Sequence, residues 1–139
     1  MMLSEEQKQK KELVKNTTAT GTFDATDGAG WNLKSTQVLF ISTVYPEFWV
    51  LGLDQFTQKL NSVIFAIPQS VPSYTLHKVC VDDRKWTQKW EVDIEGETYP
   101  VKSGWVTVEL SNNKKTIKGT LEFILKEDRK ITGSFHIFS

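Results

Sequence analysis

Five side chains near the C-terminus have the types and spacing that binding chemistry needs. They are Trp105, Lys118, Thr120, His136 and Phe138, and each of them alternates with apolar neighbours. Period-2 alternation predicts strands with one buried and one exposed face, so these five side chains would share the exposed face. There Trp105 could stack on an aromatic ring or a sugar, while His136, Thr120 and Lys118 could form hydrogen bonds.

The same five residues have a second interpretation. An apolar patch on the outer face of a sheet often packs beneath a terminal arm, against another sheet or against a second subunit. Oligomerisation through the Trp105 face is therefore an alternative to ligand binding there.

A second pair of aromatic residues, Trp86 and Trp90, falls in the apolar phase with Val92 and Ile94. Core packing is the favoured interpretation of this pair. If the strands close into a barrel, the same side chains would instead line an internal cavity suited to an apolar or aromatic ligand.

The sequence contains no recognisable arrangement of catalytic or metal-binding residues. His77 and His136 lie far apart, and Cys80 follows His77 by three residues, which places those two on opposite faces of a strand. We expect Cys80 to be a buried structural thiol, and a single cysteine excludes an intrachain disulfide and a cysteine-based metal cage. The segment 24–30 lacks the alternating ligands of a calcium loop and predicts a turn. We therefore predict no catalytic residue, no metal and no cofactor.

Composition narrows the classes of partner. Seventeen Lys and Arg residues balance seventeen Asp and Glu residues, so the chain lacks the basic excess typical of nucleic-acid-binding proteins. The longest apolar run, 63–67, is too short to span a bilayer, and the N-terminus lacks the apolar core of a signal peptide. We expect a soluble protein that is cytoplasmic by default, or exported or surface-anchored if a signal has been removed.

The elements that must position these side chains are strands. The cleanest alternation, Lys85–Glu95, places Trp86 and Trp90 on a dry face and charged residues, including Glu91 and Asp93, on a wet face. About eight to ten such short strands predict an antiparallel all-β fold, either a lipocalin-like up-and-down β-barrel or a β-sandwich. The even spacing of the hairpins favours sequential up-and-down connectivity.

The N-terminal segment predicts a short helix. Ser4 and Gln7 fit a capping box for a helix over about 5–15, in which Leu13 and Val14 are the apolar residues. So few apolar residues indicate a solvated arm. We expect residues 1–17 to form this helical arm and residues 18–139 to form a single all-β domain.

The turns near the C-terminus predict how the last three strands pair. A turn over 111–114 would pair Val108 with Ile117, and every pair in this register joins two apolar positions.

A second turn, over the charged segment 126–130, would pair Leu125 with Ile131. Together the two registers predict that Trp105, Thr120 and His136 form one row across the sheet.

The C-terminal third resembles a family of uncharacterised bacterial all-β domains that are common in Bacteroidetes lipoproteins. The residues that carry the resemblance are Tyr99, Gly104-Trp105-Val106-Thr107-Val108, Ile117-Lys118-Gly119-Thr120, Phe123 and Ile131-Thr132-Gly133-Ser134-Phe135, and 62–76 is similar to the middle of that family. The resemblance implies a compact β-barrel or sandwich with no known activity, so no functional residue carries over. The family's signal peptide and lipid-attachment cysteine have no counterpart in this sequence, so we do not expect surface anchoring from the resemblance alone.

These observations favour a non-enzymatic binding module. Its ligand would be apolar, aromatic or carbohydrate-like, and would bind in a Trp-lined cavity or on the Trp105 face. A protein-binding module, such as an inhibitor or immunity protein, is the alternative. An enzyme of unknown type is the third choice, because no acid, base and nucleophile converge.

Overall fold

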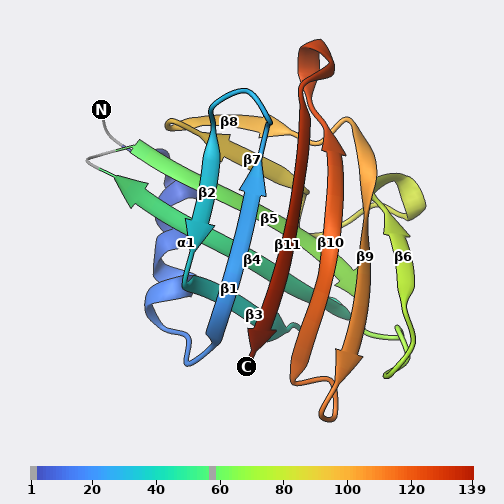
Figure 1. The fold of residues 1–139 in the computed structure, drawn as a ribbon. Coiled ribbons are helices and arrows are strands. Elements are labelled where there is room, and N and C mark those ends of the chain that lie inside the picture. Colours follow the sequence, from blue (N-terminus) through green and yellow to red (C-terminus); the bar gives the residue numbers. More distant parts are fainter. Residues whose placement is uncertain (1–2, 57–58) are drawn as a thin grey trace.

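A computed structural model describes residues 3–56 and 59–139, and shows two antiparallel sheets packed face to face with a helix on the outer side of one of them (Figure 1). The helix is α1 (Glu5–Lys15). The strands are β1 (Thr20–Thr26), β2 (Asn32–Ser35), β3 (Gln37–Ser42), β4 (Glu47–Phe56), β5 (Lys59–Pro68), β6 (His77–Cys80), β7 (Glu91–Ile94), β8 (Glu97–Pro100), β9 (Ser103–Ser111), β10 (Thr116–Ile124) and β11 (Lys130–Phe138). Short 3₁₀ turns follow β6 and β10, at Val81–Asp83 and Lys126–Asp128.

The β-sandwich expected from the sequence is confirmed, and the barrel alternative is wrong for the described residues. One sheet has the order β2-β1-β11-β10-β9-β6 and the other has the order β3-β4-β5-β7-β8. The order is not purely sequential, because the first strand pairs with the last and β6 joins the far edge of the six-stranded sheet. The helices within the described residues are too short and too polar to cross a lipid bilayer.

The main core lies between the two sheets and is built around aromatic rings. The ring of Phe65 lies 5.3 Å from Phe135, 5.8 Å from Trp90 and 6.3 Å from Phe123, measured between centroids. Trp90 is 2% exposed, which fits the core packing favoured from the sequence, and half-buried Trp86 packs against it.

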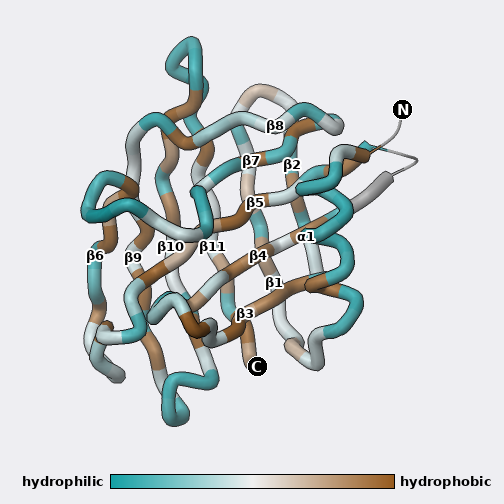
Figure 2. The backbone as a smooth tube through the Cα atoms, turned by 180° about the vertical axis from the view of Figure 1, so that it is seen from behind, coloured by the Kyte–Doolittle hydropathy of each residue, from teal (hydrophilic) through white to brown (hydrophobic). Residues whose placement is uncertain are grey.

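A second, smaller core lies on the other side of the five-stranded sheet, beneath α1 (Figure 2). Its buried residues are Leu39, Leu51, Leu53, Leu60 and Ile64, and Leu3, Leu13 and Val14 pack against them. Because β5 has the six-stranded sheet on one side and α1 on the other, it is buried continuously from Leu60 to Ile67. The capping box of Ser4 and Gln7 is confirmed, but the expectation of a solvated arm is wrong.

The predicted strand over 85–95 is mostly wrong. Only Glu91–Ile94 is a strand, and all four of its residues are buried, including Glu91 and Asp93 on the face expected to be wet. The alternating pattern predicted that the face with Glu91 and Asp93 would meet water, but α1 covers this face.

The two C-terminal hairpins have the predicted side-chain phase but not the predicted register. Val108 pairs with Gly119, and Phe123 pairs with Ile131, so each hairpin is displaced by two residues from the expectation. In the first hairpin the turn takes up four residues, 112–115, closed by a hydrogen bond from Lys115 N–H to the Ser111 carbonyl. A two-residue shift keeps each side chain on its face, but it changes which side chains share a row.

Candidate ligand-binding trough

The five residues singled out in the sequence lie on the outer face of the six-stranded sheet, but not as one cluster. His136 pairs with Lys118, and its ring lies 4.5 Å from that of Phe138 between centroids. Trp105 instead pairs with Glu122. Glu122 and Lys118 are four residues apart on β10, about 13 Å along the strand, so the predicted row of Trp105, Thr120 and His136 is wrong.

Trp105 is half-buried, and its ring is covered by a neighbouring cation. The Nζ atom of Lys78, on the edge strand β6, lies 4.3 Å from the ring centroid.

Thr120 lies between Thr107 and Ser134 and contributes to a shallow hollow of about 500 Å³ that also includes Asp24 and Thr132. Four of the residues that line this hollow carry hydroxyl groups: Thr26, Thr120, Thr132 and Ser134.

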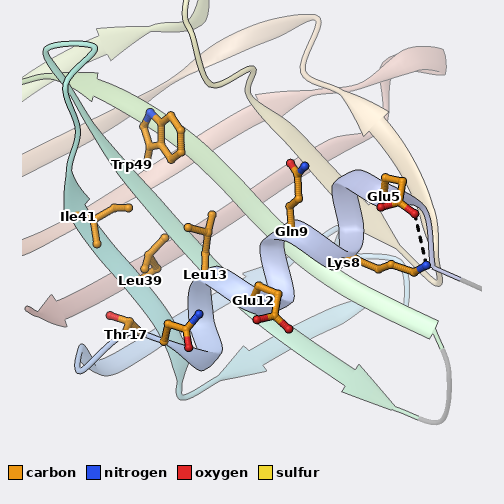
Figure 3. A pocket seen from close by; sticks show the side chains of 10 residues that line it. Glu5, Lys8, Gln9, Glu12, Leu13, Thr17, Leu39, Ile41 and Trp49 are labelled. Carbon is orange, nitrogen blue, oxygen red and sulfur yellow. Dashed lines mark hydrogen bonds and ion pairs between the residues drawn. The ribbon is translucent and has the colours of Figure 1, made fainter.

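A larger depression lies on the opposite side of the molecule, between α1 and the strands β3 and β4 (Figure 3). Its volume is about 670 Å³, and its floor is apolar, formed by Leu13, Leu39, Ile41 and Trp49. Its rim is polar and consists of Glu5, Lys8, Gln9, Glu12, Asn16 and Thr17. We call this depression the apolar compartment.

A smaller depression of about 290 Å³ adjoins it along the same side of α1, and we call this the polar compartment. Both compartments are lined by Gln9, Leu13 and Trp49, so they adjoin each other, and we call the two together the trough. Lys10, Glu91 and the loop 87–89 complete the polar compartment.

The sequence explains why a trough remains beside the helix. Leu39, Ile41 and Trp49 occupy alternate positions of β3 and β4 that face away from the main core. The helix offers few apolar side chains to that face, with Leu13 and Val14 as its own contribution. It therefore leaves Ile41 and Trp49 half-buried instead of covering them.

Trp49 is held in place by polar and aromatic contacts. Its Nε1–H donates to Glu47 Oε1 at 3.1 Å, and its ring is stacked with that of Tyr45, with centroids 5.9 Å apart and planes 6° from parallel. Glu47 is 2% exposed and also accepts the backbone N–H groups of Thr87 at 2.8 Å and Gln88 at 3.2 Å. One buried carboxylate therefore positions both the indole and the wall of the polar compartment.

A buried ionic network lies beside the polar compartment, whose lining includes Lys10 and Glu91. Lys10 Nζ lies 2.6 Å from Glu91 Oε1 and 2.7 Å from Asp93 Oδ2. Asp93 is 0% exposed and also accepts from Ser62 Oγ at 2.5 Å, from the Thr98 hydroxyl and from Gln7 Nε2 at 3.3 Å. Its satisfied oxygens explain how a carboxylate is accommodated beneath a helix.

The remaining polar residues identified from the sequence have simpler roles. Cys80 is half-buried instead of buried, and its backbone N–H donates to Asp83 Oδ2 at 2.8 Å. Cys80, Asp82 and Asp83 place possible ligand atoms within 4.8 Å of one another at an exposed turn. In the segment 24–30, the Asp27 carboxylate accepts from backbone N–H groups and from Arg129, as a turn requires.

Reasoning from the sequence did not identify Trp49, Lys10 or Glu91 as site residues. One signal could have pointed to them. The continuous apolar run 63–67 is typical of a strand covered on both faces, and the N-terminal helix is the element able to cover the second face.

Comparisons with family models, with curated proteins and with solved structures find no match to this chain. The resemblance to bacterial all-β lipoprotein domains therefore stays a prediction. The geometry of the trough and of the Trp105 face carries the argument about function.

Proposed function

We propose that this protein is a non-enzymatic binding module for a small molecule with an apolar or aromatic body, held in the trough beside α1. The observation that carries the proposal is the half-buried Trp49 ring on an apolar floor within a compartment of about 670 Å³. Sites for small ligands are typically concave, mostly apolar and about 300–1,000 Å³ in volume.

This proposal keeps the Trp-lined cavity expected from the sequence but assigns it to a different tryptophan. Trp86 and Trp90 pack in or against the core between the sheets, whereas Trp49 is the tryptophan that lines the trough. An aromatic ring fixed by Tyr45 and Glu47 needs no rearrangement to receive a ligand, which lowers the cost of binding.

The experiment is a titration with N-phenyl-1-naphthylamine, a neutral apolar dye whose emission rises in an apolar site. We expect saturable binding to the wild type and at least about tenfold weaker binding to Trp49→Ala, because loss of the ring removes much of the apolar contact area. Trp105→Ala is the matched control and should bind as the wild type does. Equal affinity of wild type and Trp49→Ala, with both folded by circular dichroism, would overturn the proposal.

A second candidate is a carbohydrate-like ligand or a protein partner on the Trp105 face. The observation that favours it is the hydroxyl-lined hollow of about 500 Å³ at Thr120, with exposed Lys118, His136 and Phe138 nearby on the same face. The same pair of variants separates the two candidates. Loss of binding in Trp105→Ala with full binding in Trp49→Ala would favour this second face.

A further inference from the structure

We infer that one end of the sandwich docks on the surface of an anionic lipid bilayer. Exposed apolar side chains would enter the boundary between headgroups and acyl chains, and lysines would contact the lipid phosphates. This end, which we call the loop end, consists of the turn between β3 and β4 (43–46), the segment before β6 (69–76) and the turn between β9 and β10 (112–115). The inference goes beyond the proposed function, because residues of the loop end do not line the trough.

Hydrogen bonds hold the three segments of the loop end side by side. Gln69 Nε2 donates to the Thr43 carbonyl at 2.8 Å, and the Gln69 carbonyl accepts from Lys114 Nζ at 2.8 Å. The N–H of Tyr74 donates to the carbonyl of Leu110, just before the turn 112–115, at 2.7 Å. In Figure 1 this turn lies at the lower end of the molecule, near the start of β6, and the turn between β10 and β11 lies at the opposite end. The three segments therefore form one surface.

Exposed apolar side chains gather at the loop end. Among the described residues, the large apolar side chains that are exposed are Val44, Tyr45, Tyr74, Leu76 and Phe138. The first four belong to the loop end, and Phe138 pairs with the first residue of β10, directly after the turn 112–115. Exposed apolar patches mark interaction surfaces. Tyrosine suits a lipid surface, because its ring is apolar and its hydroxyl is polar.

Charge indicates which kind of surface the loop end meets. Its three segments contain Lys114 and Lys115 but no Asp or Glu. The opposite end, over 27–30, 95–97 and 126–129, has five carboxylates and two cations, which lie near one another around Arg129. An anionic bilayer would therefore attract the loop end and repel the opposite end, which sets the orientation of the protein.

A hollow at the loop end has room for a lipid headgroup. Its volume is about 340 Å³, and its lining includes Ser42, Asn113, Lys114 and Lys115. Lys114 donates one hydrogen bond to the Gln69 carbonyl, and an ammonium group has three N–H donors. Lys114 and exposed Lys115 can therefore donate to a phosphate in this hollow.

A bilayer suits this surface better than a folded protein partner does. Val44 is 92% exposed and Tyr74 is 71% exposed, so each projects from its own segment with little packing around it. Protein interfaces instead concentrate their binding energy in side chains that are packed at the centre of one patch. A lipid surface accepts separate apolar side chains, because binding there depends on the apolar area buried and on attraction to anionic lipids.

The test is sedimentation of the wild-type protein with vesicles of phosphatidylcholine alone, and with vesicles that also contain phosphatidylglycerol. We expect at least about tenfold tighter binding to the anionic vesicles at low ionic strength, and weaker binding to them at about 0.5 M NaCl. Equal binding to the two compositions, or binding to neither, would overturn the inference. A dimer of the free protein in sedimentation velocity that Val44→Ser dissociates would also overturn it, because the loop end would then be an interface between two copies.

Substitutions assign the binding to the loop end. Lys115→Glu should weaken binding to the anionic vesicles at least about fivefold. Lys102→Glu is the matched control, because it changes the net charge equally at an exposed position beside Ile124, at the opposite end, and it should bind nearly as the wild type does. Equal weakening by these two variants would overturn the assignment to the loop end.

The apolar contribution is tested by Val44→Ser combined with Leu76→Ser. Both side chains are exposed, so the double variant should fold, which circular dichroism checks. We expect it to bind the anionic vesicles at least about fivefold more weakly than the wild type does, because less apolar area enters the bilayer. Unchanged affinity of the folded double variant would overturn the insertion of these side chains.

Discussion

The outer faces of the two sheets differ in what covers them. On the six-stranded sheet, Lys118, Thr120 and His136 are exposed, and polar and apolar residues alternate as the sequence indicates. On the five-stranded sheet, Ser62 and Asp93 occupy the equivalent outward positions and are fully buried beneath α1. Alternation therefore indicates which face a side chain is on, but not whether that face meets water.

The two faces also differ in how much their charged side chains contribute to the stability of the fold. Lys118 and Glu109 are 4.0 Å apart on the open face, and both side chains are partly exposed. Exposed ion pairs of this kind contribute little to the free energy of unfolding. The pairs of Lys10 with Glu91 and Asp93 are shorter and excluded from water. Removal of one partner should therefore cost more at the buried pairs than at the exposed pair.

Loss of the buried cation should have the largest effect. Lys10→Met leaves Glu91 and Asp93 buried without their ammonium, and we expect it to lower the free energy of unfolding by about 3–5 kcal/mol. Lys118→Met, on the open face, should change it by less than about 0.5 kcal/mol. Urea denaturation at pH 7 followed by circular dichroism measures both, and equal values for the two variants would contradict the contrast between the faces.

Truncation of an apolar side chain also distinguishes the two faces. Leu51 is 0% exposed between α1 and the five-stranded sheet, so Leu51→Ala should lower the free energy of unfolding by about 2–5 kcal/mol. Trp105→Ala removes a larger side chain from the open face, but that side chain is only half-buried. We therefore expect Trp105→Ala to lower the free energy of unfolding by less than Leu51→Ala does. A larger loss for Trp105→Ala in thermal or urea denaturation would show that this face is covered in solution.

The cap of α1 tests whether the helix belongs to the cooperative fold. Ser4→Ala removes the side-chain acceptor for Gln7 N–H and should lower the free energy of unfolding by about 1 kcal/mol. Ser134→Ala, on the open face, is the control and should be nearly neutral. An unchanged free energy of unfolding for Ser4→Ala would show that α1 unfolds separately from the sandwich.

The smallest expected effect is a dependence on pH at the end of the six-stranded sheet. Partial burial opposes ionisation of Asp27, but hydrogen bonds from Arg129 and from the backbone N–H groups of Ala29 and Trp31 outweigh it and lower its pKa. A lowered pKa in the folded state adds stability above the ordinary value of about 3.9, and this contribution is lost as pH falls through the folded pKa.

Asp27→Asn should therefore be less stable than the wild type at pH 7. The difference should shrink as the pH falls below about 4, because the wild-type carboxyl becomes protonated there. Urea midpoints measured across this range check the effect, and a difference that grows on acidification would contradict it.

Much of the fold could be predicted from local patterns, but little of the trough could. Alternation identified the last three strands, and Ser4 with Gln7 identified the helix start. The hairpin registers were displaced by two residues because the number of residues that a turn takes up is not encoded in alternation.

The sequence by itself determined the β-rich chain, the phase of each strand and the short capped helix, because these depend on contacts between residues close in the chain. Only the tertiary structure decided that the strands form two sheets, that α1 covers one of them, and that Lys10 meets Glu91 and Asp93. The physical reason is that burial of a polar side chain depends on which distant element packs over it, and that choice is made by the whole chain. The trough beside Trp49 exists because a helix with few apolar residues covers an apolar face incompletely.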